Sequence, residues 1–186
     1  MGTLAQWLGA REAAWLYERV RGIDGSAVEA HGGSKSISRD ETFPADIDSD
    51  DDLSRELLAL VTRASADLRS DGLTARTVTV RIRDFDFRTR QASRTVDAPV
   101  IADRVILEVS RRLLSKLRHA RRVPARLLGV GLSSLAMDAQ ADQLALFAKG
   151  GDAVAETDRD RVLARAVDKV RAKFGDRGIL PARLIE

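Results

Sequence analysis

The sequence has no cysteine, and its 186 residues include only two histidines, His31 and His119. The absence of cysteine excludes disulfides and thiolate-bound metals, and two isolated histidines are too few for a metal site. No run of about 18 apolar residues is present, so no membrane span is expected. The N-terminus also lacks the apolar stretch of a signal peptide. We therefore expect a cytoplasmic protein without a membrane partner, a metal site or a cofactor of its own.

Aromatic residues are scarce, at 4%, whereas hydrophobic residues make up 44% of the chain. Aliphatic side chains must therefore fill the core of one domain with appendages. The net charge is only +3, but it is unevenly distributed: between Arg76 and Arg126, 14 Lys and Arg residues stand against 5 Asp and Glu residues. A basic segment of this kind favours a surface that binds polyanions. A generally arginine-rich composition is the alternative explanation.

The hydrophobic periodicity predicts secondary structure in the order strand, helix, strand, strand, helix, strand. This is the order of a split βαβ, ferredoxin-like domain. We expect an α+β fold in which a four-stranded sheet carries two helices on one face, flanked by an N-terminal helix and a C-terminal helical tail. The predicted strands are 35–43, 74–83, a third that ends near Val96, and 126–135; the predicted helices are 4–20, one of about 20 residues after Asp52, 101–117 and 159–174.

An acidic run from Asp46 to Asp52 precedes the first helix of this pattern. Clustered carboxylates can hold a pair of metal ions, which is one interpretation. Carboxylates also stabilise the first turn of a helix, where they accept hydrogen bonds from free amides and meet the positive end of the dipole. We favour this second role, because no other acidic cluster lies at a suitable place.

Two helices can cover only one face of the sheet, so the other face is expected to be open. Hydroxyls, guanidinium groups and the exposed backbone of glycine all suit phosphate oxygens. Paired aromatic residues are absent, which argues against a base-stacking platform. Ordinary solvent-facing strand residues are the alternative. The candidate DNA-binding residues are Ser36, Ser38, Arg39, Thr77, Thr79, Arg81, Arg83, Arg90, Arg94, Gly129, Gly131 and Ser133.

Four separated segments, 35–43, 75–83, 84–89 and 126–133, agree in order and in amino-acid sequence with one family. They resemble the little finger domain of Y-family translesion DNA polymerases, of the DNA polymerase IV type. The similarity runs from about Leu4 to Ser134, and its first part resembles the end of the thumb. The resemblance implies that the chain binds the backbones of a primer–template duplex, including damaged DNA, during error-prone translesion synthesis and DNA repair, and is nucleoid-associated.

The resemblance also implies a division of the chain. The expected parts are 1–23 as the end of the thumb, 24–34 as a linker, 35–136 as the little finger, 137–158 as a second linker and 159–186 as a helical tail. The palm motifs that bind magnesium in this family of DNA-directed DNA polymerases (nucleotidyltransferases) do not occur here, so the chain should be inactive alone. A separate palm and fingers fragment is one expected partner. Rival interpretations are a stand-alone regulator or scaffold that binds DNA or the sliding clamp, and an unrelated ferredoxin-like RNA or metabolite binder.

A second motif lies in the small-residue segment after the last predicted strand. The pentapeptide at 143–147 resembles the peptide by which bacterial polymerases bind the sliding clamp. In that interpretation Leu146 and Phe147 enter an apolar pocket and Gln143 makes polar contacts, as in other extended-peptide complexes. Leu144 completes the set of candidate clamp-binding residues. The alternative is an internal amphipathic turn packed on the final helix.

Overall fold

The computed structural model describes residues 2–27, 33–138 and 155–185. The chain divides into two compact units, residues 1–33 and 34–186. The first unit holds two helices, α1 (Gly2–Leu8) and α2 (Ala10–Arg19). The single continuous helix predicted here is therefore wrong, because Gly9 adopts a φ of 86° between the two helices. That backbone conformation favours glycine and ends an α-helix.

The two tryptophans of this unit lie on its surface. Trp7 is 77% exposed and Trp15 is 57% exposed. The ring of Trp15 lies 5.3 Å from the guanidinium carbon of Arg19, one turn further along α2. Neither indole is buried by the helices of its own unit.

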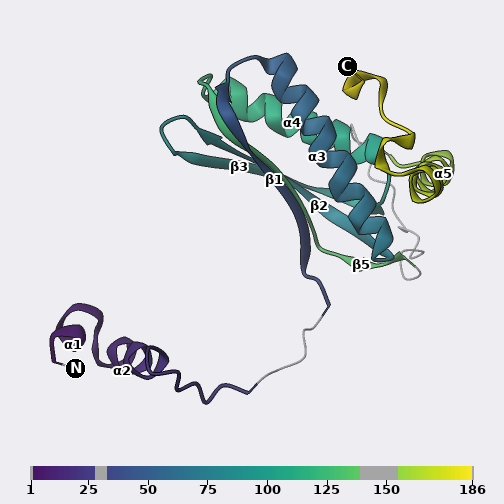
Figure 1. The fold of residues 1–186 in the computed structure, drawn as a ribbon. Helices are drawn as coiled ribbons and strands as arrows, with labels where there is room; N and C mark the ends of the chain where they lie inside the picture. The colour runs from purple at the N-terminus through teal and green to yellow at the C-terminus, as the bar shows by residue number, and fades with distance from the viewer. Residues whose placement is uncertain (1, 28–32, 139–154, 186) are drawn as a thin grey trace. The chain divides into compact units, whose positions relative to one another are not determined.

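The second unit is a sheet with helices on one side (Figure 1). Its main strands are β1 (Ser36–Ile47), β2 (Leu73–Asp84), β3 (Thr89–Val100) and β4 (Ala125–Ser133). They lie in the order β1-β4-β2-β3, and every neighbouring pair is antiparallel. A two-residue strand, β5 (Ala136–Met137), pairs with the start of β2. The predicted α+β fold and its βαββαβ order are confirmed.

Two long helices cover one face of this sheet. Helix α3 (Asp50–Ser70) lies over β1 and β4, and α4 (Asp103–Ala120) lies over β2 and β3. The core between the layers is aliphatic, as the composition predicts, and its strand residues alternate with those of the other face. The fully buried strand residues include Val78, Val80, Ile82, Leu128 and Leu132, and those of α3 include Leu53, Leu57 and Leu60.

The acidic run before α3 serves the fold. The Ser49 hydroxyl accepts a hydrogen bond of 3.2 Å from the amide of Asp52, which caps the helix. Asp48 and Asp50 both bind Arg118 near the end of α4, whose side chain is 6% exposed. These contacts join the start of one helix to the end of the other. The predicted capping by carboxylates is corrected in one respect: the cap is the Ser49 hydroxyl, whereas the carboxylates of Asp48 and Asp50 bind arginine.

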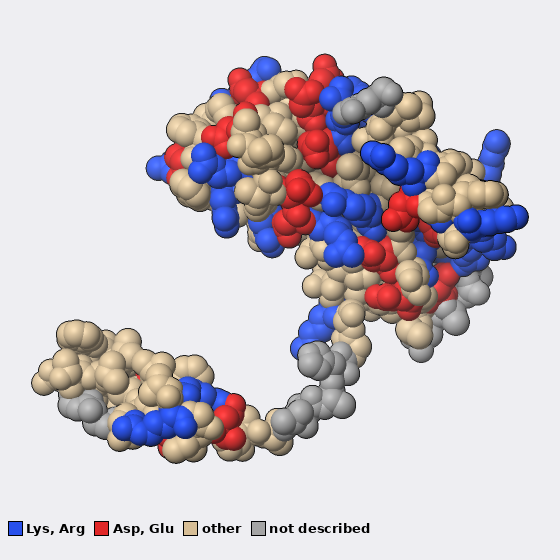
Figure 2. Space-filling view, in the orientation of Figure 1, with Lys and Arg blue, Asp and Glu red and all other residues tan. Residues whose placement is uncertain are grey.

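A third helix, α5 (Asp158–Phe174), adds to the helix layer, followed by the 3-10 turns η2 (Asp176–Gly178) and η3 (Ala182–Leu184). Ion pairs hold it there. Arg69 of α3 binds Asp168 at 2.6 Å, and Arg104 of α4 binds Asp160 at 2.7 Å. On the side of this unit that Figure 2 draws, basic and acidic groups lie side by side.

Candidate nucleic-acid interface

The strand register gathers the residues of the uncovered face into four cross-strand rows. Each row takes one residue from each of β1, β4, β2 and β3, in that order across the sheet. We call these sixteen residues the open face. The rows are Ser36, Ser133, Thr77 and Thr95; Ser38, Gly131, Thr79 and Ser93; Asp40, Gly129, Arg81 and Gln91; and Thr42, Leu127, Arg83 and Thr89.

Hydroxyl groups dominate the first two rows, and several of them bind one another. The Thr77 hydroxyl lies 3.0 Å from that of Thr95 and 3.1 Å from that of Ser134. The Thr79 and Ser93 hydroxyls are 2.8 Å apart. Each hydroxyl has one hydrogen and two lone pairs, so a pair uses one hydrogen and leaves the other free. The rows therefore offer donors at fixed positions to an anion above the sheet.

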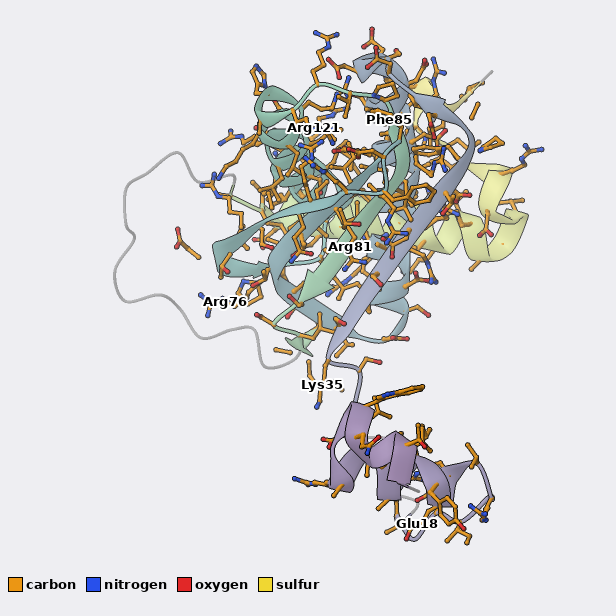
Figure 3. The ribbon with its side chains drawn as sticks, turned by 90° about the vertical axis from the view of Figure 1, so that its left-hand side faces the viewer. Glu18, Lys35, Arg76, Arg81, Phe85 and Arg121 are labelled. Atoms are coloured by element: carbon orange, nitrogen blue, oxygen red, sulfur yellow. The ribbon has the colours of Figure 1, made fainter. Side chains whose placement is uncertain are left out.

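Guanidinium groups occupy the other two rows, on the central strand. The Arg81 side chain is 47% exposed and lies near the middle of the sheet (Figure 3). Arg83 is also exposed, and its Nε donates to the Thr89 hydroxyl at 3.0 Å, which fixes the direction of its side chain. Two arginines two residues apart on one strand point to the same side. They add positive charge where the hydroxyls supply neutral donors.

Glycine brings the backbone to the surface between these side chains. A Cβ placed on Gly131 would lie 3.8 Å from the Cβ of Thr79 and 4.0 Å from that of Ser38. These are ordinary contact distances, so the space above Gly131 is open. A ligand can therefore approach the strand backbone closely at this point. The space above Gly129 differs, because the Asp40 carboxylate fills it.

Nine of the twelve candidate residues from the sequence lie together on the open face. The other three are arginines on the helix side of the sheet, and their predicted place is corrected. Arg39 pairs with Asp67 of α3 at 2.7 Å. Arg90 binds the fully buried Asp84 at 2.7 Å and donates to the Leu117 carbonyl of α4. Arg94 stands opposite the buried Val78 in the register, which sets it on the same side.

Sequence reasoning missed two polar members of the third row, Asp40 and Gln91. Gln91 could have been found from the hairpin, since it lies as far after the turn as Arg81 lies before it. That inference requires the turn to be assigned to 84–88, as the hydrogen bond from the Asp84 amide to the Arg88 carbonyl shows. Asp40 was hidden in the acidic stretch that follows it, although it alternates with Ser38.

Comparison with known proteins assigns this fold to a family. The pattern of the impB/mucB/samB family C-terminal domain matches residues 34–146, which include every strand of the open face. The chain belongs to this family. It carries the C-terminal, little finger domain of the Y-family DNA polymerase IV type.

Curated relatives agree with this assignment along most of the chain. DNA polymerase IV 1 of Mesorhizobium japonicum is 35% identical over 166 residues, which cover 88% of this chain and 36% of that protein. DNA polymerase IV of Desulfatibacillum aliphaticivorans is 31% identical over 94% of this chain and 43% of its own length. DNA polymerase IV of Ralstonia nicotianae is 38% identical over 73% of this chain and 37% of its length. This little finger chain thus spans about two fifths of these relatives.

One solved structure shows the same fold. The post-insertion binary complex of Dbh DNA polymerase matches with a TM-score of 0.50 and 19% sequence identity, over 73% of this chain and 38% of that chain. Within residues 2–27, 33–138 and 155–185, no helix is long and apolar enough to cross a membrane. In the same ranges, no group of three His, Cys, Asp or Glu side chains is placed to hold a metal ion.

Proposed function

We propose that the open face binds the sugar–phosphate backbone of duplex DNA, in particular a primer–template duplex. The observation that carries this proposal is the set of four rows, which present hydroxyls, guanidinium groups and bare backbone on the one sheet face that the described helices leave uncovered. Such donors fix a duplex by its phosphates and carry no sequence information. Binding should therefore depend strongly on salt and little on sequence.

The proposed DNA binding would be one part of a larger process. We propose that the chain is the non-catalytic, DNA-holding part of an error-prone polymerase that acts at the nucleoid in translesion synthesis and DNA repair, including on damaged DNA. Chemistry and its magnesium ions would belong to a palm outside this chain. The family match supports this role, because the chain spans about two fifths of relatives that are DNA polymerases IV.

We also propose that residues 143–147 bind a sliding clamp, which would bring the polymerase to DNA. These residues lie outside the described ranges, so the support is their sequence. The described residues on either side are tied to each other: Arg161 binds Asp138 at 3.2 Å and Glu156 at 2.6 Å. Extended peptides with such apolar residues insert them into a pocket of a partner.

The DNA proposal is tested by fluorescence anisotropy with a labelled primer–template duplex over a salt series. The test variant is Arg81→Ala/Arg83→Ala. The matched control is Arg55→Ala/Arg63→Ala, which removes two exposed arginines from α3 on the other side of the sheet. We expect the test variant to bind more weakly and to lose about 0.9 of log–log salt slope for each lost phosphate contact.

The control variant should stay close to the wild type in both quantities. Equal weakening in both variants would mean that net charge alone governs binding, and the open face would lose its assigned role. Absence of wild-type binding at low salt, or binding that resists high salt and depends on sequence, would overturn the proposal.

A further inference from the structure

Asp40 is the one acidic residue among the sixteen of the open face. A carboxylate is out of place on a surface that binds phosphate, because like charges repel. It lies in the third row, between the hydroxyl row of Ser38 and the row of Arg83, and Gly129 separates it from Arg81 along the row.

The glycine backbone of the neighbouring strand makes room for this carboxylate. Asp40 stands opposite Gly129 on the neighbouring strand. A Cβ on Gly129 would lie 1.8 Å from Asp40 Oδ1 and 2.8 Å from its Cγ, so the carboxylate rests directly on the glycine backbone. Any other residue at 129 would displace it. The glycine thus lets the carboxylate extend from β1 across β4 towards β2.

This placement brings the carboxylate to Arg81. Asp40 Oδ1 lies 3.7 Å from Arg81 Nη1, which is close enough for charge attraction but too long for a hydrogen bond. Both side chains line a shallow hollow of about 250 Å³ together with Thr79, Gln91, Gly131 and Ser133. A phosphate that enters this hollow to meet Arg81 also meets Asp40.

Other carboxylates of the sheet have a structural role that Asp40 lacks. Asp46 accepts two hydrogen bonds from Arg126, at 3.0 and 3.1 Å. Asp84 is fully buried and binds both Arg90 and Arg121. Asp40 is 36% exposed, and in the described ranges its carboxylate has the long contact with Arg81 as its ion pair. A role in stabilising the fold therefore does not explain why a carboxylate stands at position 40.

We propose that Asp40 is a built-in competitor for phosphate at Arg81, an inference that rests on the proposed DNA-binding function. Its negative charge occupies the place that a DNA phosphate would take in the third row. The open face then holds a duplex chiefly through its hydroxyl rows and Arg83. Asp40 thus keeps the affinity of the open face for the DNA backbone below the value that its other residues would give without it.

The test compares Asp40→Asn with Glu41→Gln in the same duplex titration over a salt series. Both substitutions remove one negative charge from adjacent residues, but Glu41 lies on the helix side, where it binds Arg63 of α3. We expect Asp40→Asn to bind about threefold to tenfold more tightly at low salt. Its log–log salt slope should steepen by about 0.9, as for one more neutralised phosphate. Glu41→Gln should stay within about twofold of the wild type, because its charge lies behind the sheet.

A further variant separates the mechanism from a general effect. In an Arg81→Ala background, the gain from Asp40→Asn should shrink towards that of Glu41→Gln, because the competition requires Arg81. Equal gains from Asp40→Asn and Glu41→Gln would overturn the inference. So would unchanged or weaker binding by Asp40→Asn, which would mean that Asp40 holds Arg81 in place.

The two proposals fail in different ways. If the wild-type chain does not bind duplex at low salt, the DNA-binding function fails and this inference fails with it. If the wild type binds through Arg81 and Arg83 but Asp40→Asn brings no gain, only the competitor role is lost. Thermal melting of each variant shows whether it is folded during the titration.

Discussion

Removing the Arg69 side chain should destabilise the second unit, because this arginine joins three parts of it. Its Nε and Nη2 donate to Asp168 of α5 at 2.6 and 2.8 Å. Its Nη1 donates to Asp103 at 2.6 Å and to the Ile101 carbonyl at 2.7 Å, both at the start of α4. The Arg69 side chain is only 5% exposed, so these bonds are shielded from water.

Arg69→Ala would leave two carboxylates and a carbonyl without their donor. Removing one member of a fully buried pair costs about 3–5 kcal/mol. Asp103 and Asp168 are 30% and 29% exposed, so water can partly solvate them once the arginine is gone. We therefore expect a loss of about 2–4 kcal/mol in the free energy of unfolding, somewhat below the fully buried value.

The assay is urea unfolding followed by far-UV circular dichroism, with Arg55→Ala as the matched control. Arg55 lies on the same helix and pairs with Asp52 at 3.3 Å, but it is 55% exposed. An exposed pair contributes about 0–1 kcal/mol. Arg69→Met is the second control, since it keeps the apolar stem. If Arg69→Ala and Arg55→Ala shift the midpoint equally, or if methionine restores full stability, the role assigned to the buried ion pairs is refuted.

Two other predictions concern the clamp peptide and the hairpin end of the sheet. Leu146→Ala/Phe147→Ala should abolish binding to an immobilised sliding clamp while leaving duplex affinity unchanged, and retention of clamp binding would refute the assignment. The hydrogen bond from Arg121 lowers the pKa of Asp86 to about 2. Because the unfolded value is higher, near 4, this pair stabilises the fold above pH 4 and loses that effect as the pH falls towards 2. The urea midpoint of Asp86→Asn should therefore fall less than that of the wild type over this range, and parallel curves would contradict the pairing.

The residues of the open face could be predicted where the alternation along a single strand decides them. On β2, the buried Val78, Val80 and Ile82 alternate with exposed or half-buried polar residues, and the register of this central strand is regular from Thr77 to Arg83. The two-residue period of the strand then decides on which face of the sheet each side chain of β2 lies. Arg39, Arg90 and Arg94 were misplaced because their charge was given more weight than their position in the alternation. Each of them stands next to a residue of the open face and therefore points the other way.

The contacts between distant segments could not be predicted in the same way. Asp40 and Gly129 are opposite each other only because β1 pairs with β4, and the chain between them forms most of the domain. The sequence contains no feature that sets this register to within one residue. The same holds for Glu156, whose carboxylate accepts hydrogen bonds from the amides of Ile101 and Ala102 and so caps α4 from a segment more than fifty residues away.

Helix α5 shows most clearly what periodicity leaves open. Its pattern of apolar residues predicted a helix from 159 to 174, and the structure has one from Asp158 to Phe174. Its apolar side, however, is turned outwards: Val162, Leu163 and Phe174 are 61–67% exposed, while Ala164 is buried. The docked side carries Asp160, Arg161 and Asp168, which bind arginines on α4 and α3 and Asp138 just after β5. Hydrophobic periodicity identifies the apolar side of a helix. The partners available to the opposite side decide which side docks, and here those partners are arginines and aspartates spaced to form ion pairs.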